Sequence, residues 1–296
     1  MCVILIFVDG LGVGKQDSSI NPCLTDITGL LTNTSSSRAR VLPFDGRFIP
    51  LDASLGVSGL PQSATGQTAL LTGVNAAQLV GRHLNGFPNE TLRRILRQAS
   101  ILKLAREQGY SSAFLNAFRP LFFSLDKQTQ WHLSATTVAN LAAGLPFFTL
   151  EDVAAGRAIY QDFTNRDLLE RGFEVPIYAP EEAADILVSA ASHYDFLLYE
   201  YFKTDHAGHS QDMELCREEI NKLGRFLHQI LSQIDLQQCT LILTSDHGNI
   251  EDISLKTHTY NPVMTIVWGA YRDEISQQLH TIMNVTPAIL QTLAKA

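Results

Sequence analysis

Apolar residues along this chain form short continuous runs separated by longer stretches with helical spacing. The short runs are rich in β-branched residues and predict buried β-strands over residues 2–8, 112–117, 196–201, 240–244 and 263–268. Apolar positions three or four residues apart predict amphipathic helices over 88–108, 181–191 and 212–233. Thr286-Pro287 predicts the N-cap and first residue of a last helix. The alternation of strands and helices predicts an α/β fold.

Two stretches depart from this alternation. Residues 15–60 contain turn signals and short runs rich in Ser, Thr, Pro and Gly, and no element is assigned to them. Residues 118–175 lack long apolar strands and carry several arginines. We predict that 118–175 form a small insert or lid, and that 1–117 and 176–296 form the catalytic core. Arg119 and Arg157 are candidates for substrate contacts, although scattered arginines usually lie on the surface.

Composition narrows the function class. A chain of 296 residues with 45% hydrophobic and 18% charged residues is long and apolar enough for a large folded domain. Its net charge of −8 argues against a nucleic-acid or anionic-membrane surface. The first apolar run follows no basic segment and is interrupted by Asp9, so neither a signal peptide nor a spanning helix is expected. The four cysteines are scattered, which favours reduced thiols and a cytoplasmic location.

Acidic and imidazole side chains recur next to the predicted strand ends. Asp9, Asp205 and Asp246-His247 each follow a strand, and His209 and His258 lie in nearby loops. The carboxyl ends of strands are where open α/β sheets place their ligand sites. A strand that ends in an ordinary polar turn is the alternative for each motif, and a single His is more often a surface residue. Together, three carboxylates and three imidazoles would repel one another without cations. Two divalent ions remove that conflict and suit in-line displacement at phosphorus.

A hydroxyl is also available for this chemistry. Residues 61–68 read as a polar loop that leads into a short helix, closed by Gly73. Thr68 would then lie at the helix N-terminus, where free backbone N–H groups favour an anionic group. The alternative is that Thr68 is only an N-cap residue.

These motifs, in this order, resemble those of the alkaline phosphatase superfamily. The resemblance rests on Asp9-Gly, Gly66-Gln67-Thr68, Thr204-Asp205-x-x-Gly-His209, Ser245-Asp246-His247-Gly-Asn249 and His258-Thr-x-Asn-Pro262. It is closest to the branch of cofactor-independent phosphoglycerate mutase and phosphopentomutase. It implies a three-layer α/β/α sandwich with a mixed, mostly parallel central sheet and an inserted cap. It also implies two divalent metal ions, zinc, manganese or magnesium. The implied ligands are Asp9, Thr68, Asp246 and His247 for one metal, and Asp205, His209 and His258 for the other.

Two departures from the family pattern shape the expected activity. Gly-Gln-Thr replaces the Gly-Asn-Ser of the mutases, and Thr68 is the implied nucleophile. The insert at 118–175 is short, whereas phosphoglycerate mutase has a large inserted domain. Because a mutase must exclude water from its phosphorylated intermediate, we expect a phosphatase or phosphodiesterase-like hydrolase that acts through phospho-threonine.

A phosphomutase is the second expectation, and a non-catalytic metal-binding relative is the third. The expected partner is a small phosphorylated substrate, with no nucleic acid and no membrane, and the sequence does not indicate an oligomeric state. Gln67, Lys203 and Asn249 join the two lid arginines as candidate substrate contacts.

Overall fold

A six-stranded mixed sheet forms the centre of the protein. The computed structural model describes residues 1–32, 34 and 42–295, so part of the unassigned stretch 15–60 and the last residue of the predicted core lie outside the described residues. The strand order is β2-β6-β5-β1-β4-β3. The strands are β1 (Cys2–Val8), β2 (Arg47–Leu51), β3 (Ser112–Phe114), β4 (Phe196–Tyr201), β5 (Cys239–Thr244) and β6 (Val263–Gly269).

The direction of the strands fixes the position of the site. β1 lies between β4 and β5 and runs parallel to both, and β3 runs parallel to β4. β6 is antiparallel to both β5 and β2. The carboxyl ends of β1, β4 and β5 therefore meet at one edge of the sheet. The predicted mixed, mostly parallel sheet is confirmed, and the first strand of the chain lies inside it.

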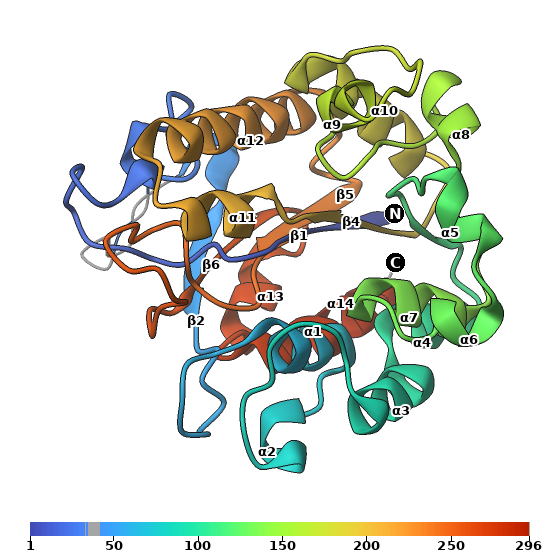
Figure 1. The fold of residues 1–296 in the computed structure, drawn as a ribbon, viewed down its shortest axis with the longest axis horizontal. Helices are drawn as coiled ribbons and strands as arrows, with labels where there is room; N and C mark the ends of the chain where they lie inside the picture. The colour runs from blue at the N-terminus through green and yellow to red at the C-terminus, as the bar shows by residue number, and fades with distance from the viewer. Residues whose placement is uncertain (33, 35–41, 296) are drawn as a thin grey trace.

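Helices cover both faces of the sheet (Figure 1). One layer contains α10 (Pro180–Ala191) and α12 (Met213–Gln233). The opposite layer contains α1 (Ser63–Thr72), α3 (Glu90–Ala99), α4 (Ile101–Glu107), α7 (Ala135–Ala143), α13 (Arg272–Gln278) and α14 (Val285–Leu293). Alternate residues of β1 enter the two cores, with Ile4 and Ile6 on one side and Val3 and Leu5 on the other. The predicted three-layer α/β/α sandwich is confirmed.

The remaining elements are short. They are the helices α2 (Ala76–Val80), α5 (Pro120–Ser124), α6 (Lys127–Gln130), α8 (Leu150–Ala154), α9 (Arg166–Glu170) and α11 (Lys203–Ser210), and the 3-10 helices η1 (Pro22–Thr25), η2 (Pro43–Asp45) and η3 (Ile282–Asn284). No helix within the described residues is both long enough and apolar enough to cross a membrane.

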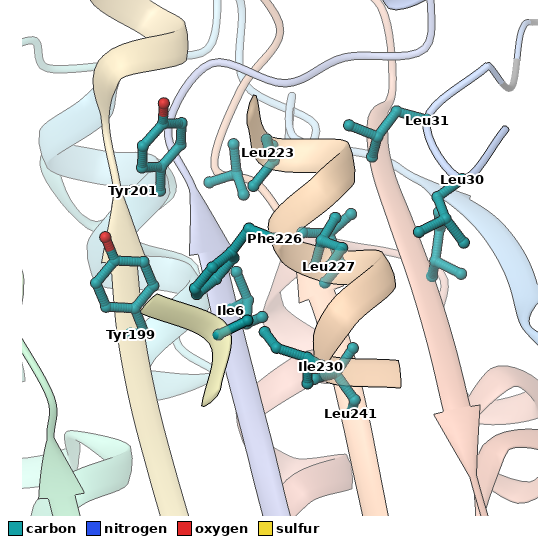
Figure 2. Packing of buried hydrophobic residues seen from close by; sticks show 14 of the residues in the cluster. Ile6, Leu30, Leu31, Tyr199, Tyr201, Leu223, Phe226, Leu227, Ile230 and Leu241 are labelled. Atoms are coloured by element: carbon teal, nitrogen blue, oxygen red, sulfur yellow. The ribbon is translucent and has the colours of Figure 1, made fainter. Parts of the chain in front are cut away.

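The long helix α12 shows how the sheet is held to its helical layer. Its apolar stripe, which includes Leu223 and Leu227, lies over Ile6 of β1 (Figure 2). Phe226 stacks on Phe163 with the ring centroids 4.5 Å apart. Full burial of one such side chain contributes about 1.5–3 kcal/mol. The helix predicted from the spacing of apolar residues is present with nearly the predicted bounds. Asp212 caps it by accepting hydrogen bonds from backbone amides of the first turn.

Several element boundaries differ from the prediction. The predicted helix 88–108 is two helices, α3 and α4, because Ser100 has an extended backbone (φ −65°, ψ 142°) between them. The predicted loop 203–209 is the helix α11. The last helix begins at Val285, and the Thr286 hydroxyl donates to the Leu70 carbonyl oxygen and does not cap the helix. Strand β2 lies in the stretch that the sequence left unassigned.

The segment 118–175 contacts both helical layers. Residues of α7, including Val138 and Ala139, belong to the same buried cluster as α1, α3 and α4. Phe163 lies in the opposite cluster, against α12. The predicted lid is therefore continuous with the core packing at these points, and its boundaries stay a prediction.

Candidate metal centre and catalytic site

Three side chains converge beyond the ends of β1 and β5. Asp9 follows β1, and Asp246 and His247 follow β5. Their potential ligand atoms all lie within 4.8 Å of one another, and all three residues are buried. His247 Nε2 lies 3.2 Å from Asp9 Oδ1 and 3.4 Å from Asp246 Oδ2. These residues form the first ligand group.

A second ligand group lies beside the first and contains Asp205, His209 and His258. Asp205 and His209 are four residues apart on α11, so that one face of the helix presents both. His209 Nε2 lies 3.4 Å from Asp205 Oδ2, and His258 Nε2 lies 3.6 Å from Asp205 Oδ1. The His247 and His258 rings stack with their centroids 3.7 Å apart, which joins the two groups into one centre.

The first group has the character of a cation site. Asp9 Oδ1 and Asp246 Oδ2 are buried and accept no hydrogen bond. Burial raises the pKa of both carboxyls, and the nearby Asp9 charge raises that of Asp246 further. Burial alone would lower the pKa of His247, but the carboxylates of Asp246 and Asp9 raise it to about 10. Buried carboxylates with oxygens lacking partners fit a divalent ion, whose charge would offset their repulsion.

The second group is more exposed and differently charged. Burial would raise the pKa of Asp205, yet the hydrogen bond to His209 and the charge of His247 lower it. The bond to Asp205 raises the pKa of His209. Burial, together with the charge of His247, lowers the pKa of His258 to about 4, so its ring is neutral at pH 7. A carboxylate with a neutral imidazole is a ligand set that suits zinc or manganese.

Neighbouring groups orient these ligands. Gln67 Nε2 donates to Asp9 Oδ2 over 3.1 Å, and Asn249 Nδ2 donates to Asp205 Oδ1 over 2.6 Å. His258 Nδ1 lies 2.9 Å from the Pro61 carbonyl oxygen, which directs Nε2 toward the site. Such outer contacts fix the ligand orientation and are part of a metal site. The side chains of Gln67 and Asn249, which were predicted as substrate contacts, are thus bonded to ligands.

Glu251 supports the centre and was absent from the predicted site. Its buried carboxylate accepts from the Gly12 amide at 2.9 Å and the Asn249 amide at 2.7 Å. The Thr259 hydroxyl and the Asn261 amide group also donate to it. It therefore ties the loops after β1 and β5 to the loop before β6. Its place two residues after Asn249 is visible in the sequence, but its partners are distant along the chain.

Thr68 does not occupy the predicted place. α1 begins at Ser63 with Gln62 as its N-cap, so Thr68 lies inside the helix and not at its start. Its hydroxyl is fully buried and donates to the Ala64 carbonyl oxygen over 2.7 Å. Within the described residues, no hydrogen bond joins this hydroxyl to either ligand group. The assignment of Thr68 as ligand and nucleophile is therefore corrected.

Ser63 supplies the hydroxyl that the prediction placed at Thr68. It is the first residue of α1, and its Oγ lies 3.1 Å from His247 Nε2, the nitrogen that faces Asp9 and Asp246. α1 approaches β5 closely at Gly66, where an added Cβ would lie 2.7 Å from the Asp246 carbonyl oxygen. The absence of a side chain at Gly66 lets the helix start reach the metal centre. The sequence feature that could have indicated Ser63 is a serine hydroxyl two residues after Pro61, at the start of the helix.

A cavity of about 620 Å³ opens beside both ligand groups. Asp9, Ser63, Asp205 and His209 contribute to its wall, and the segment 118–175 contributes further residues, including Arg119. The structure thus brings Arg119 to the site.

The other two cationic candidates for substrate contacts form ion pairs outside the cavity. Arg157 forms an ion pair with Asp152, and Lys203 forms one with Asp167, at N–O distances of 2.6 and 2.9 Å. Neither residue lines the cavity. Their assignment as substrate contacts is corrected, because each cation is already paired within the chain.

Comparison with known proteins agrees with this geometry. Residues 176–295 match the family model described as the Metalloenzyme superfamily. The matched segment contains all of the ligands identified above except Asp9. Two curated relatives carry the name 2,3-bisphosphoglycerate-independent phosphoglycerate mutase. The protein from Methanococcus aeolicus is 36% identical over 86 residues, which cover 29% of this chain and 21% of that protein. The protein from Ehrlichia canis is 27% identical over 127 residues, covering 40% and 25%.

Solved structures extend the likeness to the whole fold. Alkaline phosphatase from the Antarctic bacterium TAB5 has a TM-score of 0.58 and 14% identity, covering 100% of this chain and 98% of that chain. The PH0037 protein from Pyrococcus horikoshii has the same TM-score with 16% identity, covering 100% and 97%. Matches to the curated mutases extend over only about a fifth to a quarter of their length. The partial family match, the named relatives and the shared fold all support the resemblance of this chain to the alkaline phosphatase superfamily.

Proposed function

We propose that the protein is a two-metal phosphoryl-transfer enzyme with Ser63 as its nucleophile. The observation that carries this proposal is the position of the Ser63 hydroxyl, 3.1 Å from His247 Nε2 at the edge of the first ligand group. Both ligand groups and Ser63 lie beside one cavity that can admit a small phosphate ester. The match of residues 176–295 to the Metalloenzyme superfamily and the likeness to phosphoglycerate mutases support the same reaction class.

Different side chains would have different roles in the reaction. Asp9, Asp246 and His247 would hold one divalent cation, and Asp205, His209 and His258 the other. When bound, the two cations would polarise a phosphoryl oxygen and stabilise negative charge on the attacking and leaving oxygens. The Ser63 hydroxyl gives its proton to solvent and its oxygen forms a bond to phosphorus, while the bond to the leaving oxygen breaks and that oxygen takes up a proton from water. The N-terminal end of α1 favours the anionic group that results.

Hydrolysis of the phosphoserine by water is the first choice for the second half of the reaction. The segment 118–175 contributes only part of the cavity wall, and water that reaches the intermediate would release inorganic phosphate. Transfer to a second hydroxyl is the other candidate, because the curated relatives reported above are named as mutases. A non-catalytic relative is less well supported, since both ligand groups and a hydroxyl are present.

One experiment tests the proposal and separates the two reactions. The protein is stripped with a chelator and reloaded with zinc, manganese or magnesium. It is then given a ³²P-labelled phosphate monoester, with and without an unlabelled glycerate or sugar phosphate acceptor. We expect metal-dependent consumption of the ester, with phosphate release in proportion. Label on the acceptor with little free phosphate would establish the mutase instead. No turnover with any metal, together with no metal binding, would overturn the proposal.

A further inference from the structure

The cavity beside the metal centre continues into a second one. A cavity of about 300 Å³ shares seven residues with the larger cavity, among them the charged residues Arg119 and Glu200. Its own wall is mainly apolar and includes the aromatic residues Phe118, Phe122 and Tyr160. The phosphoryl group would lie at the metal end, so the rest of the substrate would extend past the shared residues toward this apolar wall. The identity of these shared residues therefore bears on which leaving group fits.

Glu200 is a buried carboxyl whose position is tightly fixed. It lies on β4, and the residue is only 7% exposed. The Asn116 side chain bonds both its carbonyl oxygen and its amide, at 2.8 and 2.9 Å. The Thr136 hydroxyl donates to Oε2 over 2.6 Å. The other oxygen, Oε1, has no hydrogen bond within the described residues, although Glu200 lines both cavities.

Arg119 complements Glu200 in the same wall. It is partly buried, and no ion pair or hydrogen bond engages its guanidinium within the described part of the chain. By contrast, the lid arginines Arg157 and Arg166 pair with Asp152 and Glu218. A partly desolvated guanidinium without a partner favours an anionic ligand, because it can form bidentate hydrogen bonds to a carboxylate or phosphate.

We infer that Glu200 and Arg119 form a specificity subsite for the leaving group of the substrate. The inference rests on the proposed phosphoryl-transfer function. Glu200 Oε1 accepts a hydrogen bond from a hydroxyl of the leaving group, and Arg119 binds an anionic substituent on the same carbon skeleton. The preferred class is thus the phosphate esters of hydroxylated, anionic compounds such as hydroxy acids. Phosphate esters with a plain aryl or alkyl group leave both residues without a partner and are selected against.

Paired substrates and variants test the subsite in the metal-loaded protein. The kcat/KM ratio of phosphoglycerate to phenyl phosphate is measured for the wild type, Glu200→Met, Glu200→Gln and Arg119→Gln. Arg157→Gln is the matched control, because Arg157 is a lid arginine outside the cavity. We expect Glu200→Met and Arg119→Gln to lower the ratio about tenfold or more, mainly through a higher KM for phosphoglycerate. We expect Glu200→Gln, which keeps an oxygen acceptor, to lower this kcat/KM ratio less than Glu200→Met does. Arg157→Gln should leave the ratio unchanged.

The outcomes separate the subsite from the catalytic proposal. If the wild type turns over phenyl phosphate and the ratio is unchanged in Glu200→Met and Arg119→Gln, the subsite is wrong and the proposed function stands. If the wild type turns over neither ester with any metal, the proposed function fails and the subsite fails with it. Thermal melts of each variant confirm that the proteins compared are folded.

Discussion

At the scale of single residues, Ser63 and Thr68 lie five positions apart on one helix and have different surroundings. Ser63 Oγ lies next to His247 Nε2, whereas the Thr68 hydroxyl is bonded to Ala64 inside the helix. We predict that Ser63→Ala abolishes turnover of phosphate esters, and that Thr68→Ala retains it. Rates of phosphate release, with trapping of the phosphorylated protein, measure both effects. Full activity in Ser63→Ala would exclude Ser63 as the nucleophile.

The two ligand groups predict separate losses of metal. Asp205 and His258 belong to one group and Asp246 to the other. We expect about two divalent ions per wild-type chain and about one in Asp205→Ala or His258→Ala, because each alanine removes a ligand of the same ion. Asp246→Ala should empty the other position. Elemental analysis after dialysis measures the stoichiometry, and a full complement of two ions in all three variants would contradict the assignment.

The buried Glu200 predicts a pH-dependent stability in the metal-free protein. Burial raises its pKa from 4.5 to about 7, which the Thr136 hydrogen bond only partly opposes. The folded protein therefore keeps this proton at pH values where the unfolded chain has released it. The stability from the neutral carboxyl is fully present below about pH 4.5 and is lost as the pH rises through about 7.

A comparison with Glu200→Gln isolates this effect. The amide does not ionise, so the wild type should lose on the order of 2–3 kcal/mol relative to the variant between pH 4.5 and 8. Denaturant unfolding of both proteins at several pH values measures the difference. A difference that is constant with pH would show that Glu200 does not titrate as described.

At the scale of elements, the approach of α1 to β5 positions the nucleophile. Gly66 has no room for a side chain, because its Cβ would lie 2.7 Å from the backbone oxygen of Asp246. We predict that Gly66→Ala pushes the start of α1 away from the metal centre. Turnover should fall at least tenfold, and stability by about 1–3 kcal/mol. Kinetics and denaturant unfolding measure both, and an unchanged kcat would show that the helix position is not critical.

The sequence predicts the elements with strong apolar patterns and misses those without one. β1 and β4 have the predicted bounds, since continuous apolar runs mark buried parallel strands. The first half of α1 is Ser-Ala-Thr-Gly-Gln and α11 is rich in polar residues, so neither start has an apolar stripe. That is why the predicted helix began too late and Thr68 was chosen over Ser63. Strand β2 contains Pro50 and has mostly half-buried residues, which weakens its strand signal.

The site itself was predictable to a similar degree. The convergence of six candidate ligands follows from motifs at the ends of strands, because the carboxyl ends of parallel strands meet at one edge. Whether an arginine such as Arg157 faces the cavity or pairs with Asp152 depends on packing that no local pattern encodes. The cytoplasmic location and the metal identity stay predictions.

At the scale of the whole molecule, metal binding should stabilise the fold. The buried carboxylates of Asp9 and Asp246 repel each other in the metal-free protein, and a bound cation removes that cost. We predict that a chelator lowers Tm by several degrees, given that 1 kcal/mol shifts Tm by about 2–4 °C in domains of 150–250 residues. Calorimetry before and after re-addition of metal measures the shift. An unchanged Tm in protein shown to have lost its metal would contradict the prediction.

The strand order has a consequence for how the chain folds during its synthesis. β1, at the start of the chain, takes its place only between β4 and β5, whose residues are made much later. Such distant pairings raise the contact order and slow folding. During synthesis, Asp9 and Ser63 leave the ribosome long before Asp246 and His258, so neither ligand group is complete until about five-sixths of the chain has been made. A nascent chain stalled before His247 would therefore have neither ligand group complete.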